Sequence, residues 1–236
     1  MARAPLLQVN EISLTFGGDP VFEDMSLVVQ SGDRLALVGR NGSGKSTLMK
    51  VMAGLVEADS GDVIVGPGVS VGYMEQDPDL TGFETLGDFA AHGLDPSEMY
   101  KVERAGEGLK FDPARPVSTA SGGERRRAAL ARLMASEPEL MLLDEPTNHL
   151  DIRHQLSILE LIQRLPTTAI IALHDLNQAT LCDRICVLQD GKLRAIGTPS
   201  EIMTEPLLRE VFGVCGHFLV DPADNAQVIR FHTATH

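Results

Sequence analysis

A glycine-rich segment at residues 39–47 limits the possible fold more than any other feature of this chain. It reads Gly-Arg-Asn-Gly-Ser-Gly-Lys-Ser-Thr, follows the apolar run at 35–38 and precedes the mostly apolar stretch at 48–52. This order predicts a buried strand, a glycine loop and a helix. Glycines let several main-chain N–H groups point at one phosphate chain, and a helix N-terminus adds partial positive charge there. An ordinary glycine-rich turn is the alternative, but the flanking pattern favours a phosphate-binding loop, here called the P-loop.

The side chains of the P-loop have the chemistry that a bound nucleoside triphosphate requires. Lys45 can reach the terminal phosphates, and the Ser46 hydroxyl can ligate Mg²⁺. The residues expected to contact the nucleotide are Gly39, Arg40, Asn41, Gly42, Ser43, Gly44, Lys45, Ser46 and Thr47.

The charge and hydropathy of the chain argue against nucleic acid as a direct partner and against membrane insertion. The 236 residues include 20 Lys and Arg against 33 Asp and Glu, and this net charge of −13 repels a polyphosphate backbone. Apolar runs such as residues 169–173 are far shorter than the roughly 20 residues that cross a bilayer. The opening residues, Met1 to Pro5, do not have the pattern of a cleavable leader. We therefore expect a cytoplasmic chain that reaches a membrane only through a partner.

The cysteines Cys182, Cys186 and Cys215 are too few and too unevenly spaced for a disulfide framework. The spacing of Cys182 and Cys186 could suit a metal on a helix. The apolar strand expected at 185–188 instead favours buried thiols in a reducing cytosol, with a metal site as the minor alternative.

The hydrophobic patterns predict alternating strands and helices, which is typical of an α/β fold with a parallel sheet covered by helices. Predicted strands lie at 6–16, 21–30, 35–38, 62–65, 69–73, 140–143, 168–173, 184–188 and 192–196, with weak candidates near Phe218 and Val228. Predicted helices lie at 122–136, 152–164 and 176–181, and short helices are expected after Pro199. Turn residues at 66–68 and 190–191 predict hairpins. The polar, loosely helical segment 77–116 predicts an inserted lobe.

Further motifs follow the P-loop in a fixed order. Ser121-Gly122-Gly123-Glu124 opens a predicted helix, and Asp144-Glu145 ends a predicted apolar strand. Asn148-His149-Leu150-Asp151 follows closely, while Gln76 and His174 each lie just past a predicted strand. Together with the P-loop, this set resembles the ATP-binding-cassette (ABC) ATPases over nearly the whole chain.

The resemblance implies a P-loop NTPase core with an antiparallel β subdomain and a short inserted helical subdomain. Residues 1–236 would form a single nucleotide-binding domain, with ATP and Mg²⁺ as cofactors. The catalytic core would comprise 1–76 and 137–198, the helical subdomain 77–136, and a C-terminal extension 199–236.

The oxygen-bearing side chains among these motifs suit Mg²⁺, which takes few protein ligands and completes its octahedron with water and phosphate. Ser46 and Gln76 can ligate the ion directly, and Asp144 can hold a coordinated water. Glu145 is placed to polarise the attacking water, whereas a structural acidic pair at a strand end is the alternative for the two carboxylates. The resemblance makes His174 a switch residue at the γ-phosphate, although a lone histidine is often only structural.

By resemblance, the signature segment acts on the nucleotide of a second subunit, so that two chains enclose two ATP molecules head to tail. The residues concerned are Ser121, Gly122, Gly123 and Glu124, and Asp151 would couple the two sites. Phe16 resembles the aromatic residue that stacks on adenine, with a core aromatic as the alternative. The run Arg125-Arg126-Arg127 is interpreted as a solvated face, with contacts to the partner's phosphates as the minor alternative.

The two halves of the chain resemble different branches of the family. The part up to residue 127 resembles the ABC-F group of soluble, translation-associated ATPases. The part from residue 151 onwards resembles the ATPase subunits of siderophore, haem and cobalamin importers, so a recombined or designed chain is also a hypothesis. We expect an importer's ATP-binding subunit, held at the inner face of the cell membrane by permease subunits. The alternatives are an ABC-F-like ribosome-associated ATPase and an ATPase core of mixed parentage without a transport partner.

Overall fold

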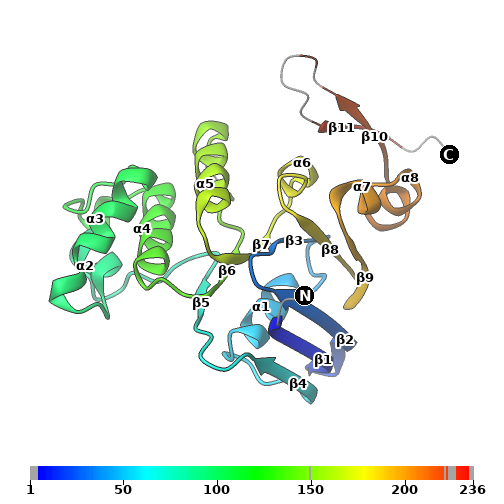
Figure 1. Cartoon of the computed structure of the whole chain (residues 1–236), viewed down its shortest axis with the longest axis horizontal. Helices are drawn as coiled ribbons and strands as arrows, with labels where there is room; N and C mark the ends of the chain where they lie inside the picture. Colours follow the sequence, from blue (N-terminus) through cyan, green and yellow to red (C-terminus); the bar gives the residue numbers. More distant parts are fainter. Residues whose placement is uncertain (1–4, 149, 221, 223–226, 234–236) are drawn as a thin grey trace. The chain divides into compact units, whose positions relative to one another are not determined.

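The structure is a computed structural model that describes residues 5–148, 150–220, 222 and 227–233. It divides into two compact units: the first comprises Met1–Pro67 and Ile170–His236, and the second comprises Gly68–Ala169 (Figure 1). The sequence-based division into core, helical subdomain and extension stays a prediction. The opening residues 1–4, on which the leader expectation rests, lie outside the described residues. Within the part that is described, no helix combines the length and apolar character needed to span a membrane.

The first unit contains an antiparallel sheet of the order β2-β1-β4. β1 is Pro5–Phe16, β2 is Asp19–Gln30 and β4 is Ser60–Val65. Leu7 and Val9 are buried at alternate positions of β1, and so are Ile12 and Leu14 after a shift of register between Val9 and Ile12. Gly17 and Gly18, both with positive φ, turn the chain between β1 and β2, so the predicted pair of strands is confirmed.

The first unit also holds the strand that precedes the P-loop. β3 (Arg34–Gly39) runs parallel to β8 (Arg184–Gln189), and β9 (Lys192–Gly197) pairs with β8 in antiparallel fashion. The predicted hairpin at 184–196 is therefore confirmed. The residues Leu35–Val38 of β3 are fully buried, which explains why this strand has no polar alternation. Helix α1 (Lys45–Met52) follows β3, as the sequence predicts.

The rest of the first unit consists of short elements. α6 is Leu176–Ala179, α7 is Pro199–Ile202, α8 is Glu205–Leu207, and a π-helical turn spans Leu208–Phe212. β10 (Val214–Val220) and β11 (Gln227–Thr233) form an antiparallel pair, which confirms the two weak strand candidates.

The second unit combines a parallel strand pair with helices. β5 (Val71–Met74) pairs with β6 (Leu140–Asp144). The helices are α2 (Leu86–Ala91), α3 (Tyr100–Leu109), α4 (Gly122–Ala135) and α5 (Ile152–Arg164), with 3-10 turns at Pro96–Glu98 and Val117–Thr119. α2 and α3 both pack on α4 (Figure 1). β7 (Thr168–Ala172) crosses the boundary between the units.

The predicted hairpin around residues 66–68 is wrong. β4 pairs with β1 in the first unit, whereas β5 pairs with β6 in the second. Gly68 has a φ of +74°, so the chain does turn where glycine and proline predict it. Turn chemistry fixes only the local bend, however, and the fully buried β6 is the partner that covers the main chain of β5.

Candidate functional site

The P-loop has the backbone conformation that its glycines are needed for. A Cβ on Gly39 would lie 2.4 Å from the carbonyl oxygen of Leu188 and 2.5 Å from Oγ of Ser43, so no side chain fits there. Gly42 and Gly44 have φ values of +81° and +94°, in the left-handed region. Gly44 is also the N-cap of α1, so no side chain caps the first N–H groups of that helix. These donors are the groups that a phosphate would accept from.

Lys45 is buried, with 5% of its surface exposed, and its ammonium group is held by the loop itself. Nζ donates to the main-chain oxygens of Gly39 (3.0 Å) and Arg40 (3.4 Å). The positive charge therefore lies over the loop before any ligand arrives. Arg40 turns its own side chain elsewhere, because Nη2 donates to the carbonyl oxygen of Phe212 at 3.3 Å. Ser46 is half-buried in the first turn of α1.

Two further predicted site residues belong to the first unit. Phe16 ends β1 and is 56% exposed, so the core-aromatic alternative is wrong. An exposed ring is what adenine stacking requires, and that role stays a prediction. His174 is exposed just after β7. The preceding Leu173 is held by a hydrogen bond from its N–H to the carbonyl oxygen of Leu37 (3.1 Å), the residue two positions before Gly39 on β3.

The second unit places both adjacent carboxylates at the end of β6. Asp144 and Glu145 are 2% and 7% exposed. Tyr73 donates its hydroxyl to Oδ2 of Asp144 at 3.3 Å, and burial together with this carboxylate raises the pKa of Tyr73 far above its usual value. The phenol therefore stays protonated and remains a donor. Glu145 has a φ of +51°, an uncommon backbone conformation for a residue with a side chain, and one that clusters at functional sites.

The carboxylate of Glu145 is held in one orientation by two amide groups. Nε2 of Gln76 and Nδ2 of Asn148 both donate to its Oε2 atom, at 2.8 and 2.9 Å. The amide oxygen of Gln76 is not used in this bond. The structure thus brings together the residue predicted to polarise water and one of the residues predicted to ligate Mg²⁺.

Arg126 is the functional residue that the sequence interpretation missed. The solvated-face interpretation is wrong for this residue, which is 4% exposed. Nε donates to the carbonyl oxygen of Gln76 (3.1 Å), Nη1 to that of Asn148 (2.7 Å), and Nη2 to Oδ1 of Asp77 (2.9 Å). Helical spacing was the available signal, because Arg126 is four residues before the buried Leu130 and therefore shares its face.

The start of α4 is closed by a reciprocal cap. Oγ of Ser121 accepts from the N–H of Glu124 (3.3 Å), while Oε2 of Glu124 accepts from both N–H (2.9 Å) and Oγ (2.8 Å) of Ser121. The main-chain bond from Ser121 is the main reason why the pKa of Glu124 is lowered. A Cβ on Gly123 would lie 2.8 Å from Cδ2 of Leu150, whereas one on Gly122 would meet open space. The signature segment therefore packs directly on Leu150.

Asp151 is the N-cap of α5. Its Oδ1 accepts from the N–H of His154 (2.9 Å), and its Oδ2 lies 2.7 Å from Nδ1 of the same histidine. The main-chain bond from His154 is the main reason why the pKa of Asp151 is lowered. Asp151 is exposed, and the nearby His149 lies outside the described residues.

The predicted site residues therefore form two sets, one on each unit. The first unit carries the P-loop, Phe16 and His174. The second carries Gln76, Asp144, Glu145, Asp151 and the signature segment.

The cysteines are buried free thiols, as predicted. Burial raises the pKa of Cys182 and of Cys186 to about 12, so both are protonated at neutral pH. No cluster of three or more His, Cys, Asp or Glu side chains suited to a metal occurs within the described ranges.

Comparison with known proteins agrees with this geometry. The family model described as "ABC transporter" matches residues 22–148. The ATP-binding protein Uup of Caulobacter vibrioides is 43% identical over 83% of this chain, which spans about a third (32%) of that relative. The petrobactin import ATP-binding protein FpuC of Bacillus anthracis is 32% identical over 89% of this chain and 87% of its own.

A solved inward-facing metal-chelate type ABC transporter shares the fold, with a TM-score of 0.84, 24% identity and 97% of each chain covered. The α/β fold with a P-loop core is thus confirmed. The chain belongs to the ABC transporter family.

Proposed function

We propose that this chain is the ATP-hydrolysing subunit of an importer for an iron chelate or a related solute, and that it works as a head-to-tail dimer. The chain spans most of FpuC, whose printed name describes petrobactin import, and this supports the importer reading. The observation that carries the catalytic part is the pair of amide hydrogen bonds that fixes Glu145.

The P-loop would bind the phosphate chain of ATP. The left-handed glycines Gly42 and Gly44 leave main-chain N–H groups available, and the first turn of α1 adds its partial positive charge. Lys45 would exchange its bonds to Gly39 and Arg40 for bonds to the terminal phosphates, which are charge-assisted and stronger. Phe16 would stack on adenine, and His174 would contact the γ-phosphate.

Glu145 would accept a hydrogen bond from the attacking water and act as its general base. Because Gln76 and Asn148 both bind Oε2, the carboxylate cannot rotate freely, and its other oxygen keeps a defined direction. Holding a general base in position in this way removes an orientation cost from the reaction.

The donor set available for Mg²⁺ consists of hard oxygen ligands, as that ion prefers. Ser46 and the amide oxygen of Gln76 would bind the ion directly, and the buried Asp144, held by Tyr73, would bind one of its waters. The ion would neutralise the negative charge of the phosphates. Mg²⁺ needs few protein ligands, and Ser46 and Gln76 would supply two.

The dimer would complete each site with the signature segment of the second copy. Gly122 faces open space at the start of α4, so the first N–H groups of that helix have room for a phosphate oxygen. Ser121 would have to exchange its bond to Glu124 for one to the γ-phosphate.

The importer role is tested by co-purification with permease subunits of the metal-chelate type in detergent, with and without ATP. Retention of the chain and stimulation of its ATPase by those subunits are expected. A basal ATPase that no such permease retains or stimulates would contradict the importer role while leaving hydrolysis intact.

A second candidate is a soluble ribosome-associated ATPase of the ABC-F kind. The 43% identity with Uup over 83% of the chain favours it. Co-sedimentation with ribosomes in the presence of ATP, lost in its absence, would support this role over the importer role.

A further inference from the structure

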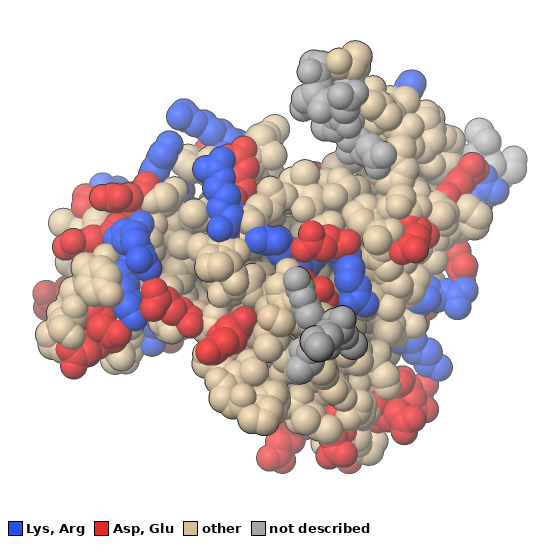
Figure 2. Space-filling view, in the orientation of Figure 1, with Lys and Arg blue, Asp and Glu red and all other residues tan. Residues whose placement is uncertain are grey.

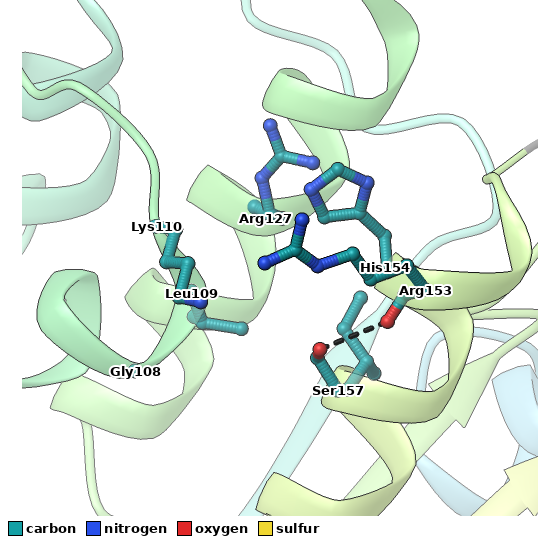
Figure 3. Close-up of a pocket in the computed structure, with 8 residues that line it drawn as sticks. Gly108, Leu109, Lys110, Arg127, Arg153, His154 and Ser157 are labelled. Atoms are coloured by element: carbon teal, nitrogen blue, oxygen red, sulfur yellow. Dashed lines mark hydrogen bonds between the residues drawn. The ribbon is translucent and has the colours of Figure 1, made fainter.

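A pocket of about 160 Å³ opens in the second unit between the end of α3, the second turn of α4 and the start of α5 (Figure 3). Its polar lining residues are Lys110, Arg127, Arg153, His154 and Ser157. None of them belongs to the P-loop or to the predicted catalytic residues, and only Arg127 was considered for phosphate contact, as the minor alternative for the run 125–127. Figure 3 shows the Arg153 side chain reaching from α5 into the pocket, below the guanidinium group of Arg127 and toward the wall formed by Leu109 and Lys110.

The pocket gathers positive charge on a chain that is strongly acidic overall. The net charge is −13, and acidic and basic side chains are interspersed on the face shown in Figure 2. Yet Lys110, Arg127 and Arg153 form no ion pair within 4.0 Å with any residue that the structure describes. Like charges held around one small cavity repel each other, so this arrangement favours an anion between them.

The two carboxylates that feel the charge of Arg127, those of Asp151 and Glu124, are engaged with other partners. Asp151 is bonded to the N–H and ring of His154, and Glu124 is bonded to Ser121. Arg127 contributes to the lowered pKa of both carboxyls, but it makes no ion pair with either in the described chain. Nε of Arg127 is itself buried and has no hydrogen-bond partner in the described residues.

We propose that this pocket binds a small phosphate-bearing anion, with Arg127 and Arg153 as its guanidinium donors and Lys110 as a third positive charge. Guanidinium groups present paired N–H donors that match phosphate oxygens, and lysine adds a compact charge. The cavity is far larger than the roughly 10–15 Å³ that one water needs, so a phosphate group fits. The hydroxyl of Ser157 donates to the carbonyl of Arg153 (2.8 Å) and stabilises the helical turn that carries that arginine.

The site is independent of the P-loop, which also binds phosphate, so the test must separate the two. Pyrophosphate is titrated into the full-length, ¹⁵N-labelled chain, with chloride at matched ionic strength as the reference. Saturable shifts are expected for the amides of Lys110 and of residues 153–157. Shifts at Gly42 and Gly44 report the P-loop separately, so that failure of the nucleotide site and failure of this pocket are distinguishable.

Arg153→Gln should weaken pyrophosphate binding at the pocket by about tenfold or more, because one charge-assisted donor pair is lost. Arg164→Gln is the matched control, since it removes the same charge from the far end of α5. There, Nη2 of Arg164 lies 3.9 Å from Oε2 of Glu160. The control should keep the affinity of the pocket. Absence of pocket shifts, equal shifts with chloride, or equal weakening in both variants would overturn the proposal. If Arg153→Gln instead weakens self-association and leaves the titration unchanged, the cations serve a second copy of the chain and the proposal is wrong.

Discussion

Nε of Arg126 donates to the main-chain oxygen of Gln76 over 3.1 Å, and this bond joins the helix of the signature segment to the loop that holds Glu145. The same guanidinium group donates to the carbonyl oxygen of Asn148 at 2.7 Å. Gln76 and Asn148 are the two residues whose amides fix Oε2 of Glu145. Arg126 is therefore a positioning residue for the proposed general base.

Replacing Arg126 by Ala should destabilise the chain by about 2–4 kcal/mol, because two main-chain acceptors lose a charged donor in a buried place. It should also lower kcat, since Gln76 and Asn148 lose their support. Urea unfolding and steady-state ATPase kinetics measure the two effects. Arg126→Lys keeps the charge but not the three-way geometry, and should recover stability more fully than kcat. An Arg126→Ala variant as stable and as active as Arg164→Ala would contradict the positioning role.

Local sequence patterns predicted most of the fold. The helix at 152–164 has the predicted bounds, and β10 and β11 occur at the two weak candidates. The hairpin at 66–68 failed because a turn motif does not specify which strands pair. Arg126 was missed because a run of arginines suggests solvent, whereas its three acceptors come from residues 22 to 50 positions away in the chain. Contacts of that kind depend on tertiary structure and leave no local pattern.

Replacing Glu145 by Gln should lower ATP turnover by about 10²-fold or more, because the variant cannot accept a proton from water. ATP binding should remain, and the ATP-bound dimer should accumulate, as measured by size-exclusion chromatography with light scattering. Glu160→Gln, an exposed change on α5, is the control and should leave turnover unchanged. A variant that stays monomeric with ATP bound would argue against the shared site.

Replacing Lys45 by Ala should weaken ATP binding by about tenfold or more. The buried ammonium of Lys45 is the positive charge that lies over the P-loop and would bind the terminal phosphates. Lys50→Ala tests the same helix at its other end, in the last turn, and should bind ATP nearly as the unchanged chain does. Isothermal titration calorimetry compares the two. Equal affinities for both variants would remove Lys45 from the nucleotide site.

The two glycines at the start of α4 offer a matched pair. Alanine at either position gains similar helix propensity, but at Gly123 its Cβ would lie 2.8 Å from Cδ2 of Leu150. Gly123→Ala should therefore be less stable than Gly122→Ala by about 1 kcal/mol or less, because the terminal methyl of the half-buried Leu150 can shift to relieve the contact. Thermal unfolding of both variants measures the difference. Coincident unfolding curves would show that the signature segment does not pack tightly on Leu150.

The thiols of Cys182 and Cys186 should resist modification in the folded chain. Burial raises both pKa values to about 12, so the reactive thiolate is scarce at pH 8. In a Cys215→Ala background, a thiol-disulfide reagent at pH 8 should label neither cysteine until denaturant is added.

The raised pKa values of Cys182 and Cys186 also set the direction in which pH changes the stability of the chain. Thiols ionise near pH 8.5 in the unfolded chain, so the free energy of unfolding should fall as pH rises from about 8.5 towards 12. Cys186→Ala should reduce that slope, and an unchanged slope with rapid labelling of the native chain would show that these thiols are accessible.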